Sequence, residues 1–273
     1  METLVTNQAN NLDSYHLILT KVQFITRELQ ITFKKNTGRP MAIPASEIIA
    51  IALFKQSNGI PTKMQVYTML QPKCSYKTLV IQMNNLSLYA LYILKIIMLD
   101  NVKNAHVIKH TDSTDIPVSL IKNSKYHKTM EGLASYGYSA KGFYYGLRLS
   151  ITTDLDRRLL NIHFTSANGN DRDAFLKMNK DIHGIFVADA GYISAELARK
   201  FYIENKRILF AKPKANMKKI MTMWQKNLYD TRMLIELNFR NLKLFYGIIT
   251  SMPRSIAGYI ANYIYSILAY VLA

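Results

Sequence analysis

YDTRMLIELNFRNLK, residues Tyr229–Lys243, combines an apolar repeat with a lone glutamate among bases. Its leucines and isoleucine recur at helical spacing and predict one buried side of a helix. Four of its charged side chains follow one another at steps of four, four and three, so they fall on one helical face: Arg232, Glu236, Arg240 and Lys243. A glutamate flanked by cations is also typical of a surface salt-bridge ladder, and this stretch alone leaves both interpretations open.

Two apolar segments upstream each end with an aspartate. HVIKHT, residues 106–111, predicts a strand that ends at Asp112, and GIFVA, residues 184–188, predicts a strand that ends at Asp189. Two carboxylates at strand ends and a third on a later helix form an arrangement that can hold two divalent cations against a phosphodiester. We prefer Asp112 to the nearby Asp115 because Asp112 completes the strand.

The order of the two aspartates and Glu236 resembles that of the DDE transposases of bacterial insertion sequences. The glutamate lies within the Tyr-Arg-Glu-Lys spacing of that family, here Tyr229, Arg232, Glu236 and Lys243. The resemblance extends from about Asp112 to the C-terminus through YGYSAKGFYYGLRLSITTD, FTSANGNDRDA and ADAGYIS. Many members have a lysine directly after the second aspartate, where this chain has Ala190.

The resemblance implies an α/β fold, a ribonuclease-H-like mixed five-stranded sheet flanked by helices and preceded by a small all-α N-terminal domain. Residues 105–273 would be the catalytic domain. The sequence pattern predicts a hairpin of Tyr144–Thr153 with Leu159–Thr165 after the first strand, and a strand over Arg207–Lys212 after the second aspartate. The resemblance implies that three of the strands are antiparallel and that two parallel ones follow. Predicted helices cover about Asp171–Asn179, capped by Asn170 or Asp171, and Ser194–Asn205, and a basic connector spans Pro213–Lys219.

The activity that the resemblance implies is that of a DNA transposase. It would cleave and rejoin the ends of its own insertion sequence by metal-dependent phosphodiester hydrolysis and strand transfer. Asp112, Asp189 and Glu236 would be catalytic and would hold two Mg²⁺ ions, with Mn²⁺ as a substitute, because hard cations prefer oxygen ligands. Two alternatives stay open: a catalytically inactive remnant that acts only as a DNA-binding protein, and a stand-alone nuclease of the same fold.

The charge of the chain indicates its partner. The chain has 35 basic and 18 acidic residues, which gives a formal net charge of +17. This charge favours an extended polyanion as the binding partner over a membrane surface. With the resemblance, this predicts double-stranded DNA, both element ends and target, bound by a homodimer that pairs two ends. The single cysteine, Cys74, excludes an internal disulfide, so we expect a cytoplasmic, nucleoid-associated bacterial protein.

Residues 1–104 predict a helical N-terminal domain with a helix-turn-helix outline. Helices are expected over Asp13–Glu28, over Pro44–Gln56 with Ser46 as cap, over Thr62–Leu70, and twice within Ser75–Leu99. Lys63 and Lys77 are its candidate DNA contacts, although any small helical bundle gives the same outline. The uncharged segment Ser255–Ala273 carries isoleucines at helical steps and predicts a buried helix rather than a membrane span.

Other candidate DNA contacts lie beside the carboxylates. Residues 122–141 form a basic segment interleaved with tyrosines, in which Lys125, Lys128 and Lys141 can hold phosphates, with a merely solvated loop as the alternative. On the glutamate helix, the cations suit phosphates and the tyrosine suits a displaced base: Arg232, Arg240, Lys243 and Tyr229. His110 is expected to be structural or to face DNA.

Overall fold

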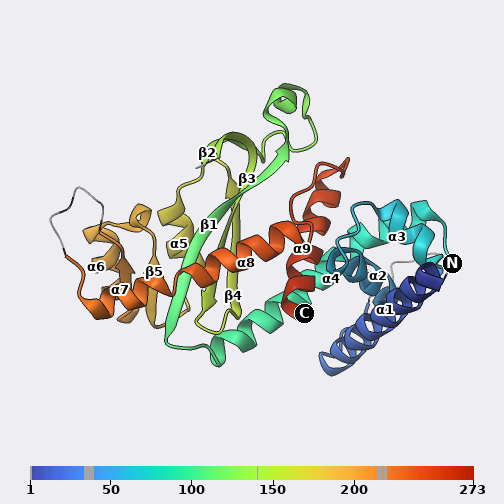
Figure 1. Cartoon of the computed structure of the whole chain (residues 1–273), viewed down its shortest axis with the longest axis horizontal. Helices are drawn as coiled ribbons and strands as arrows, with labels where there is room; N and C mark the ends of the chain where they lie inside the picture. Colours follow the sequence, from blue (N-terminus) through green and yellow to red (C-terminus); the bar gives the residue numbers. More distant parts are fainter. Residues whose placement is uncertain (1, 34–39, 140, 214–216, 218–219) are drawn as a thin grey trace. The chain divides into compact units, whose positions relative to one another are not determined.

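A computed structural model describes residues 2–33, 40–139, 141–213, 217 and 220–273, with side chains from Leu12 onward (Figure 1). The chain forms two compact units. The first comprises Met1–Lys95, Leu242–Ile248 and Met252–Ala273, and the second comprises Ile96–Asn241 and Ile249–Ser251. The assignment of a DNA-binding role to residues 1–104 and a catalytic role to residues 105–273 stays a prediction.

The first unit is helical. Its helices are α1 (Glu2–Glu28), α2 (Ala45–Ser57), α3 (Lys63–Leu70), the first part of α4 (Tyr76–Lys103) and α9 (Ile256–Leu272). Helix α2 is buried along most of its length and packs against α1 and α9. The Gln56 amide fixes the α2–α9 contact, because it donates to Asn262 Oδ1 at 2.9 Å and to Ser266 Oγ at 2.8 Å.

Two details of this unit differ from the sequence prediction. Ser46 does not cap α2: Pro44 occupies the N-cap position, and no side chain caps the helix there. The two helices expected within Ser75–Leu99 are one continuous helix, α4, because that segment contains no glycine or proline to end a helix. The short helix α3 forms as predicted, with a capping box between Thr62 and Gln65.

Among the described helices, α4 has the length and apolar composition that a membrane span requires, a property it shares with the core helices of globular proteins. Helix α9 is apolar but shorter. Its residues from Gly258 to Ala269 are mostly buried inside the first unit, as expected for a helix that closes a core.

The second unit is built on a mixed sheet. Its strands are β1 (Ile108–Ser119), β2 (Ser135–Ser139), β3 (Gly142–Asp154), β4 (Leu159–Ser166), β5 (Ile185–Ala188) and β6 (Ile208–Ala211). The order is β2-β3-β1-β5-β6, with β4 also paired to β3. Strands β1 to β4 pair antiparallel, whereas β5 runs parallel to both β1 and β6.

The five strands β4-β3-β1-β5-β6 give the predicted ribonuclease-H-like arrangement of three antiparallel strands followed by two parallel ones. The sixth strand, β2, was not predicted. It pairs with the first residues of β3, as in Tyr136 opposite Tyr145, while β4 takes the later residues of β3 from Leu147 onward. Part of the basic segment that was expected to be a loop is therefore a strand.

Helices flank the sheet: α5 (Asp171–Met178), α6 (Ala195–Asn205), α7 (Met223–Asp230) and the first part of α8 (Met233–Leu244). Asn170 and Ser194 cap α5 and α6 with their side chains. Phe175, Phe186 and Phe201 meet in an aromatic core that packs α5 and α6 against β5, with ring centroids 4.9–5.8 Å apart. Rigid packing beneath β5 fixes the position of the residue that follows it, Asp189. The connector predicted at Pro213–Lys219 lies largely outside the described residues.

Candidate active site

Asp112 lies in the first half of β1 and not at the strand end that the sequence suggested. Strand β1 continues to Ser119 because its pairing with β3 continues, with Asp112 opposite Ile151 and Asp115 opposite Arg148. Asp115 is therefore a strand residue too, and strand completion does not distinguish it from Asp112. What distinguishes Asp112 is its contact with Arg232, four residues before the glutamate: Asp112 Oδ2 accepts a hydrogen bond from Arg232 Nη2 at 2.7 Å.

Asp189 directly follows β5, as predicted. The last residues paired between β1 and β5 are His110 and Val187, so Asp112 and Asp189 each lie two residues further along neighbouring parallel strands. Parallel strands carry equivalent positions to the same edge of a sheet, which brings these carboxylates together. The Tyr229 hydroxyl donates to Asp189 Oδ1 at 3.2 Å and ties that carboxylate to α7.

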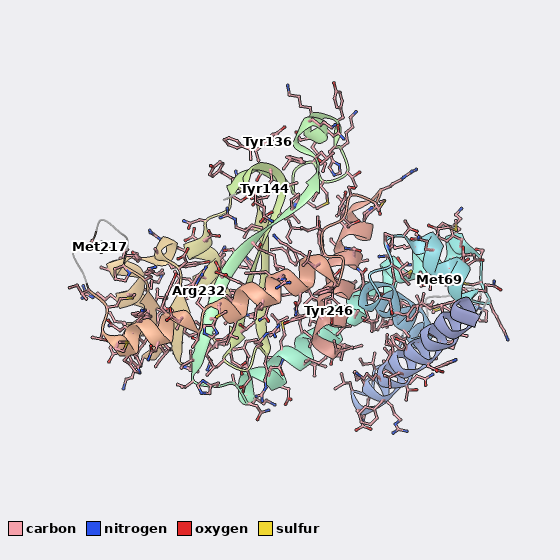
Figure 2. All side chains as sticks on the ribbon, in the orientation of Figure 1. Met69, Tyr136, Tyr144, Met217, Arg232 and Tyr246 are labelled. Carbon is pink, nitrogen blue, oxygen red and sulfur yellow. The ribbon has the colours of Figure 1, made fainter. Side chains whose placement is uncertain are left out.

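The segment that was predicted as one helix over Tyr229–Lys243 is two helices. Helix α7 ends at Asp230 and α8 begins at Met233, and both pass over one face of the sheet (Figure 1). Arg232 lies in the break, where Figure 2 places it over β1. Glu236 lies in the first turn of α8, four residues later, and Arg232 contacts it across the break, as in the salt-bridge ladder that the sequence left open.

Arg232 connects two of the three carboxylates. Its Nη2 donates to Asp112 at 2.7 Å and its Nη1 donates to Glu236 Oε1 at 2.6 Å. The side chains of Arg232 and Asp112 are 15% and 17% exposed, whereas that of Glu236 is 59% exposed. The guanidinium thus forms one nearly buried ion pair and one solvent-exposed ion pair, and removing one partner of the nearly buried pair costs more, because the other charge is left buried and unpaired.

Burial dominates the electrostatics of Asp112. It raises the pKa of this carboxyl to about 6, although the Arg232 charge and the Ser113 backbone N–H both lower it. The negative charges of Asp189 and Glu236 raise this pKa further. Asp189 and Glu236 therefore both act on Asp112, and Arg232 is the positive charge that acts against them.

His110 holds the break between the helices against β1. Its Nε2 lies 2.8 Å from Thr231 Oγ1, and Thr231 Oγ1 itself donates to the Leu228 carbonyl at 2.7 Å. Because the threonine hydroxyl has one proton, His110 Nε2 must be the donor in their contact. Burial lowers the pKa of His110 to about 4, so the ring is neutral near pH 7. Full burial makes the role of His110 structural, and it does not face DNA.

The three carboxylates are not gathered around one point. Among the described residues, no group of three or more His, Cys, Asp or Glu side chains is arranged to hold a metal ion. Arg232 stands between Asp112 and Glu236 and neutralises both. The donor atoms themselves are all carboxylate oxygens, which are the ligands that Mg²⁺ and Mn²⁺ prefer. Donor chemistry fits these cations, and the metal-ligand roles stay a prediction.

The candidate DNA contacts differ in how freely they can reach a ligand. Most are exposed: Lys125 in the 3₁₀ helix Ile121–Tyr126, Lys128 shortly after it, Lys141 before β3, Lys77 on α4 and Arg240 on α8. Lys243 is half-buried near the end of α8. The Lys63 ammonium is engaged within the protein, because it donates to Asn84 Oδ1 at 2.8 Å and burial lowers its pKa to about 8.

Three polar residues near the carboxylates were missed from the sequence as site residues: Ser113, Asp171 and Tyr192. The sequence offered Asp171 only as one of two candidate helix caps, and Asn170 is the residue that caps α5. Ser113 contacts Asp171, 58 positions later in the chain, and Tyr192, 79 positions later. No local spacing in the sequence reveals contacts over such distances.

The sheet order and the carboxylates define a ribonuclease-H-like fold with an acidic site at the β1–β5 junction. Residues 101–256, more than half of the chain, match the family model described as the Transposase DDE domain, and the chain belongs to that family. It is a DDE-type transposase. No curated protein matches the chain.

Two solved structures show distant similarity, a Mos1 mariner paired end complex with Mn and a pre-cleavage Mos1 transpososome. They are 10% and 9% identical to this chain, and each match covers 92% of this chain and 84% of the other. Their TM-scores are 0.25 and 0.24, values too low to support an inference.

Proposed function

We propose that this transposase cleaves and rejoins the ends of its own insertion sequence at the site formed by Asp112, Asp189 and Glu236. The observation that supports this most is the convergence of β1, β5 and α8 on Arg232, whose charge is felt by all three carboxylates. Like charges held close together cost stability, and carboxylates with perturbed pKa values concentrate at functional sites.

Divalent cations complete this proposal. The oxygens of Asp112, Asp189 and Glu236 would hold two Mg²⁺ ions, with Mn²⁺ as a substitute, and the cations would make the attacking hydroxyl more acidic and stabilise the leaving oxygen. The protein's own groups would orient the DNA. The planar fork of Arg232, which now binds two carboxylates, also matches a phosphate and would hold one at the cleavage point. Tyr229 would position Asp189 and contact a displaced base.

A basic aromatic surface beside the sheet would bind the double-stranded DNA of element ends and target. Lys125, Lys128 and Lys141 are exposed there, together with Tyr126 and Phe143, which are 83% and 74% exposed. Lysines bind phosphates and release counterions, and exposed rings stack on unpaired bases. We further propose that a homodimer pairs two ends, within the bacterial cytoplasm and its nucleoid.

The test is cleavage of a labelled duplex that carries the sequences flanking the coding region. We expect nicking in Mg²⁺ or Mn²⁺ by the native chain and none by Glu236→Gln. Glu196→Gln is the matched control, because Glu196 is an exposed glutamate in the first turn of another helix, α6, of the same unit. Native DNA binding without nicking would instead identify an inactive remnant, and nicking without joining would identify a nuclease.

A further inference from the structure

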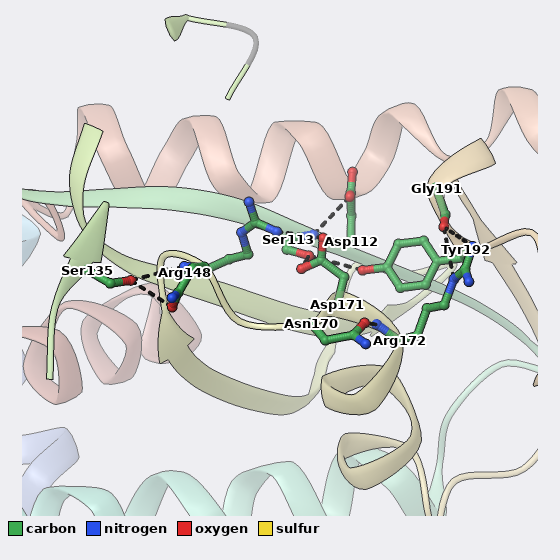
Figure 3. Close-up of polar contacts among 10 residues, drawn as sticks. Asp112, Ser113, Ser135, Arg148, Asn170, Asp171, Arg172, Gly191 and Tyr192 are labelled. Carbon is green, nitrogen blue, oxygen red and sulfur yellow. Dashed lines mark hydrogen bonds and ion pairs between the residues drawn. The ribbon is translucent and has the colours of Figure 1, made fainter. Parts of the chain in front are cut away.

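The first turn of α5 contacts residues that follow the two aspartates in the chain (Figure 3). Asn170 caps the helix by accepting from the Arg172 N–H, which leaves the Asp171 carboxylate available for other partners. Asp171 Oδ1 accepts from Ser113 Oγ at 2.9 Å, and Asp171 Oδ2 accepts from Arg148 Nη1 at 2.7 Å.

Ser113 connects this carboxylate to Asp112. Its backbone N–H donates to Asp112 Oδ1 at 2.8 Å, and its hydroxyl donates to Asp171. Successive residues of a strand point to opposite faces, so Asp112 faces Arg232 while the Ser113 hydroxyl faces α5. Asp171 therefore acts on Asp112 through the backbone of its neighbour and does not reach the reacting side itself.

Tyr192 connects the same carboxylate to Asp189. Tyr192 is buried in the 3₁₀ turn Ala190–Tyr192 that follows Asp189, and its hydroxyl lies 3.0 Å from Ser113 Oγ. The serine proton is directed to Asp171, so the tyrosine donates, and burial raises the pKa of Tyr192 and keeps it protonated.

Arg172 makes a second contact between α5 and the 3₁₀ turn Ala190–Tyr192. Its guanidinium donates to the Ile193 carbonyl at 2.8 Å and to the Gly191 carbonyl at 3.3 Å. Asp171 and Arg172 are adjacent on α5. Asp171 contacts Ser113, which directly follows Asp112, and Arg172 contacts Gly191 and Ile193, which lie two and four residues after Asp189. The four elements β1, β3, α5 and the 3₁₀ turn are joined at one point.

We propose that Asp171 is a positioning residue that sets the separation of Asp112 and Asp189 through Ser113 and Tyr192. This inference rests on the proposed function of the two aspartates. A purely structural role would arise from favourable charge at a helix N-terminus. Asp173 supplies the same charge in the same turn and is exposed. Comparing variants of Asp171 and Asp173 therefore distinguishes the positioning role from the purely structural one.

The test compares Asp171→Ala with Asp173→Ala in the full chain. Four quantities are measured: single-turnover cleavage at saturating DNA, DNA affinity, the melting temperature, and Mn²⁺ affinity without DNA by electron paramagnetic resonance. We expect Asp171→Ala to lower the cleavage rate and the Mn²⁺ affinity about ten- to a hundredfold, the range found for residues that orient metal ligands. DNA affinity should stay unchanged, and Asp173→Ala should match the native chain throughout.

Two further variants sharpen the result. Asp171→Asn keeps an oxygen for Ser113 and should recover part of the lost rate. Ser113→Ala should cost little once Asp171 is already alanine, because both changes interrupt one connection. Equal losses in the Asp171 and Asp173 variants, or losses confined to melting temperature, would overturn the inference. If the native chain fails to cleave, the proposed function fails, and an unchanged Mn²⁺ affinity in Asp171→Ala would then overturn the positioning role separately.

Discussion

Replacing Arg232 by glutamine should destabilise the metal-free protein in a pH-dependent way. The guanidinium is the positive charge in contact with Asp112, and glutamine keeps hydrogen-bonding capacity without that charge. Arg240→Gln, on the exposed face of α8, is the matched control and should change the free energy of unfolding by no more than about 0.5 kcal/mol.

The magnitude follows from the two contacts of Arg232. Breaking a buried ion pair by removing one partner costs about 3–5 kcal/mol. The contact with Asp112 is of this kind, because both side chains are less than 20% exposed, whereas the exposed contact with Glu236 contributes about 0.5 kcal/mol. We expect a loss of about 3 kcal/mol at pH 8, where Asp112 is ionised in the native protein.

The pH dependence follows from the raised pKa of Asp112. Its value of about 6 lies above the ordinary 3.8, so ionisation of Asp112 lowers native stability as the pH rises from about 4 to 6. Without Arg232 this pKa rises further. At pH 5 Asp112 is mainly protonated in both proteins, and the difference should shrink to the roughly 1 kcal/mol of a lost hydrogen bond.

The assay is urea unfolding followed by circular dichroism in buffers that contain a chelator, at pH 5 and pH 8. A stability difference that opens between these two pH values confirms the electrostatic account of the site. Equal losses at both pH values, or no loss at pH 8, would refute it.

Three further predictions concern other residues. Lys55→Met should stabilise the first unit by about 2 kcal/mol at pH 7, because burial lowers the pKa of Lys55 to about 8 and its ammonium contacts only a neutral amide oxygen among the described residues. Between pH 8 and 10.5 the native protein has lost the Lys55 proton while the unfolded chain still binds it. The free energy of unfolding of the native chain therefore rises over this range, and the stability advantage of Lys55→Met should vanish. Replacing Lys125 and Lys128 by glutamine should reduce the slope of log DNA affinity against log salt by about 2. Tyr229→Phe, which loses one hydrogen bond, should slow cleavage several-fold and leave DNA affinity nearly unchanged.

Each of these predictions has an outcome that contradicts it. A Lys55→Met protein whose unfolding free energy equals the native value at pH 7 would show that the buried ammonium carries no cost. An unchanged salt slope would remove Lys125 and Lys128 from the DNA surface. Native cleavage rates in Tyr229→Phe would show that its hydroxyl does not position Asp189.

Where most strands and helices lie along the chain could be predicted from local patterns, whereas their arrangement in the sheet was implied by the family resemblance. The β3–β4 hairpin, the strand before Asp189 and the helix capped by Ser194 form close to their predicted bounds, since alternation and capping act over a few residues. The length of β1 could not be predicted, because Ser113 to Ser119 are held in a strand by pairing with β3. The break at Thr231 also depends on a distant contact, the hydrogen bond to His110.

The same distinction applies to the site. Family spacing predicted which acidic residues to consider, and the structure brings Asp189 and Glu236 within electrostatic reach of Asp112. Spacing could not show that Arg232 would bind two of them at once, nor that Asp171 would contact the backbone beside Asp112. Both contacts arise from tertiary packing.

Strand joining tests the central proposal most directly, that these carboxylates form the active site of a transposase. A labelled element end with a free 3′-hydroxyl is incubated with supercoiled target DNA and Mn²⁺, using the native chain, Asp189→Asn and the control Asp173→Asn. We predict joined product with the native chain and the control, and none with Asp189→Asn. Joining by Asp189→Asn at the native rate, or its absence from the native chain while cleavage persists, would contradict the account.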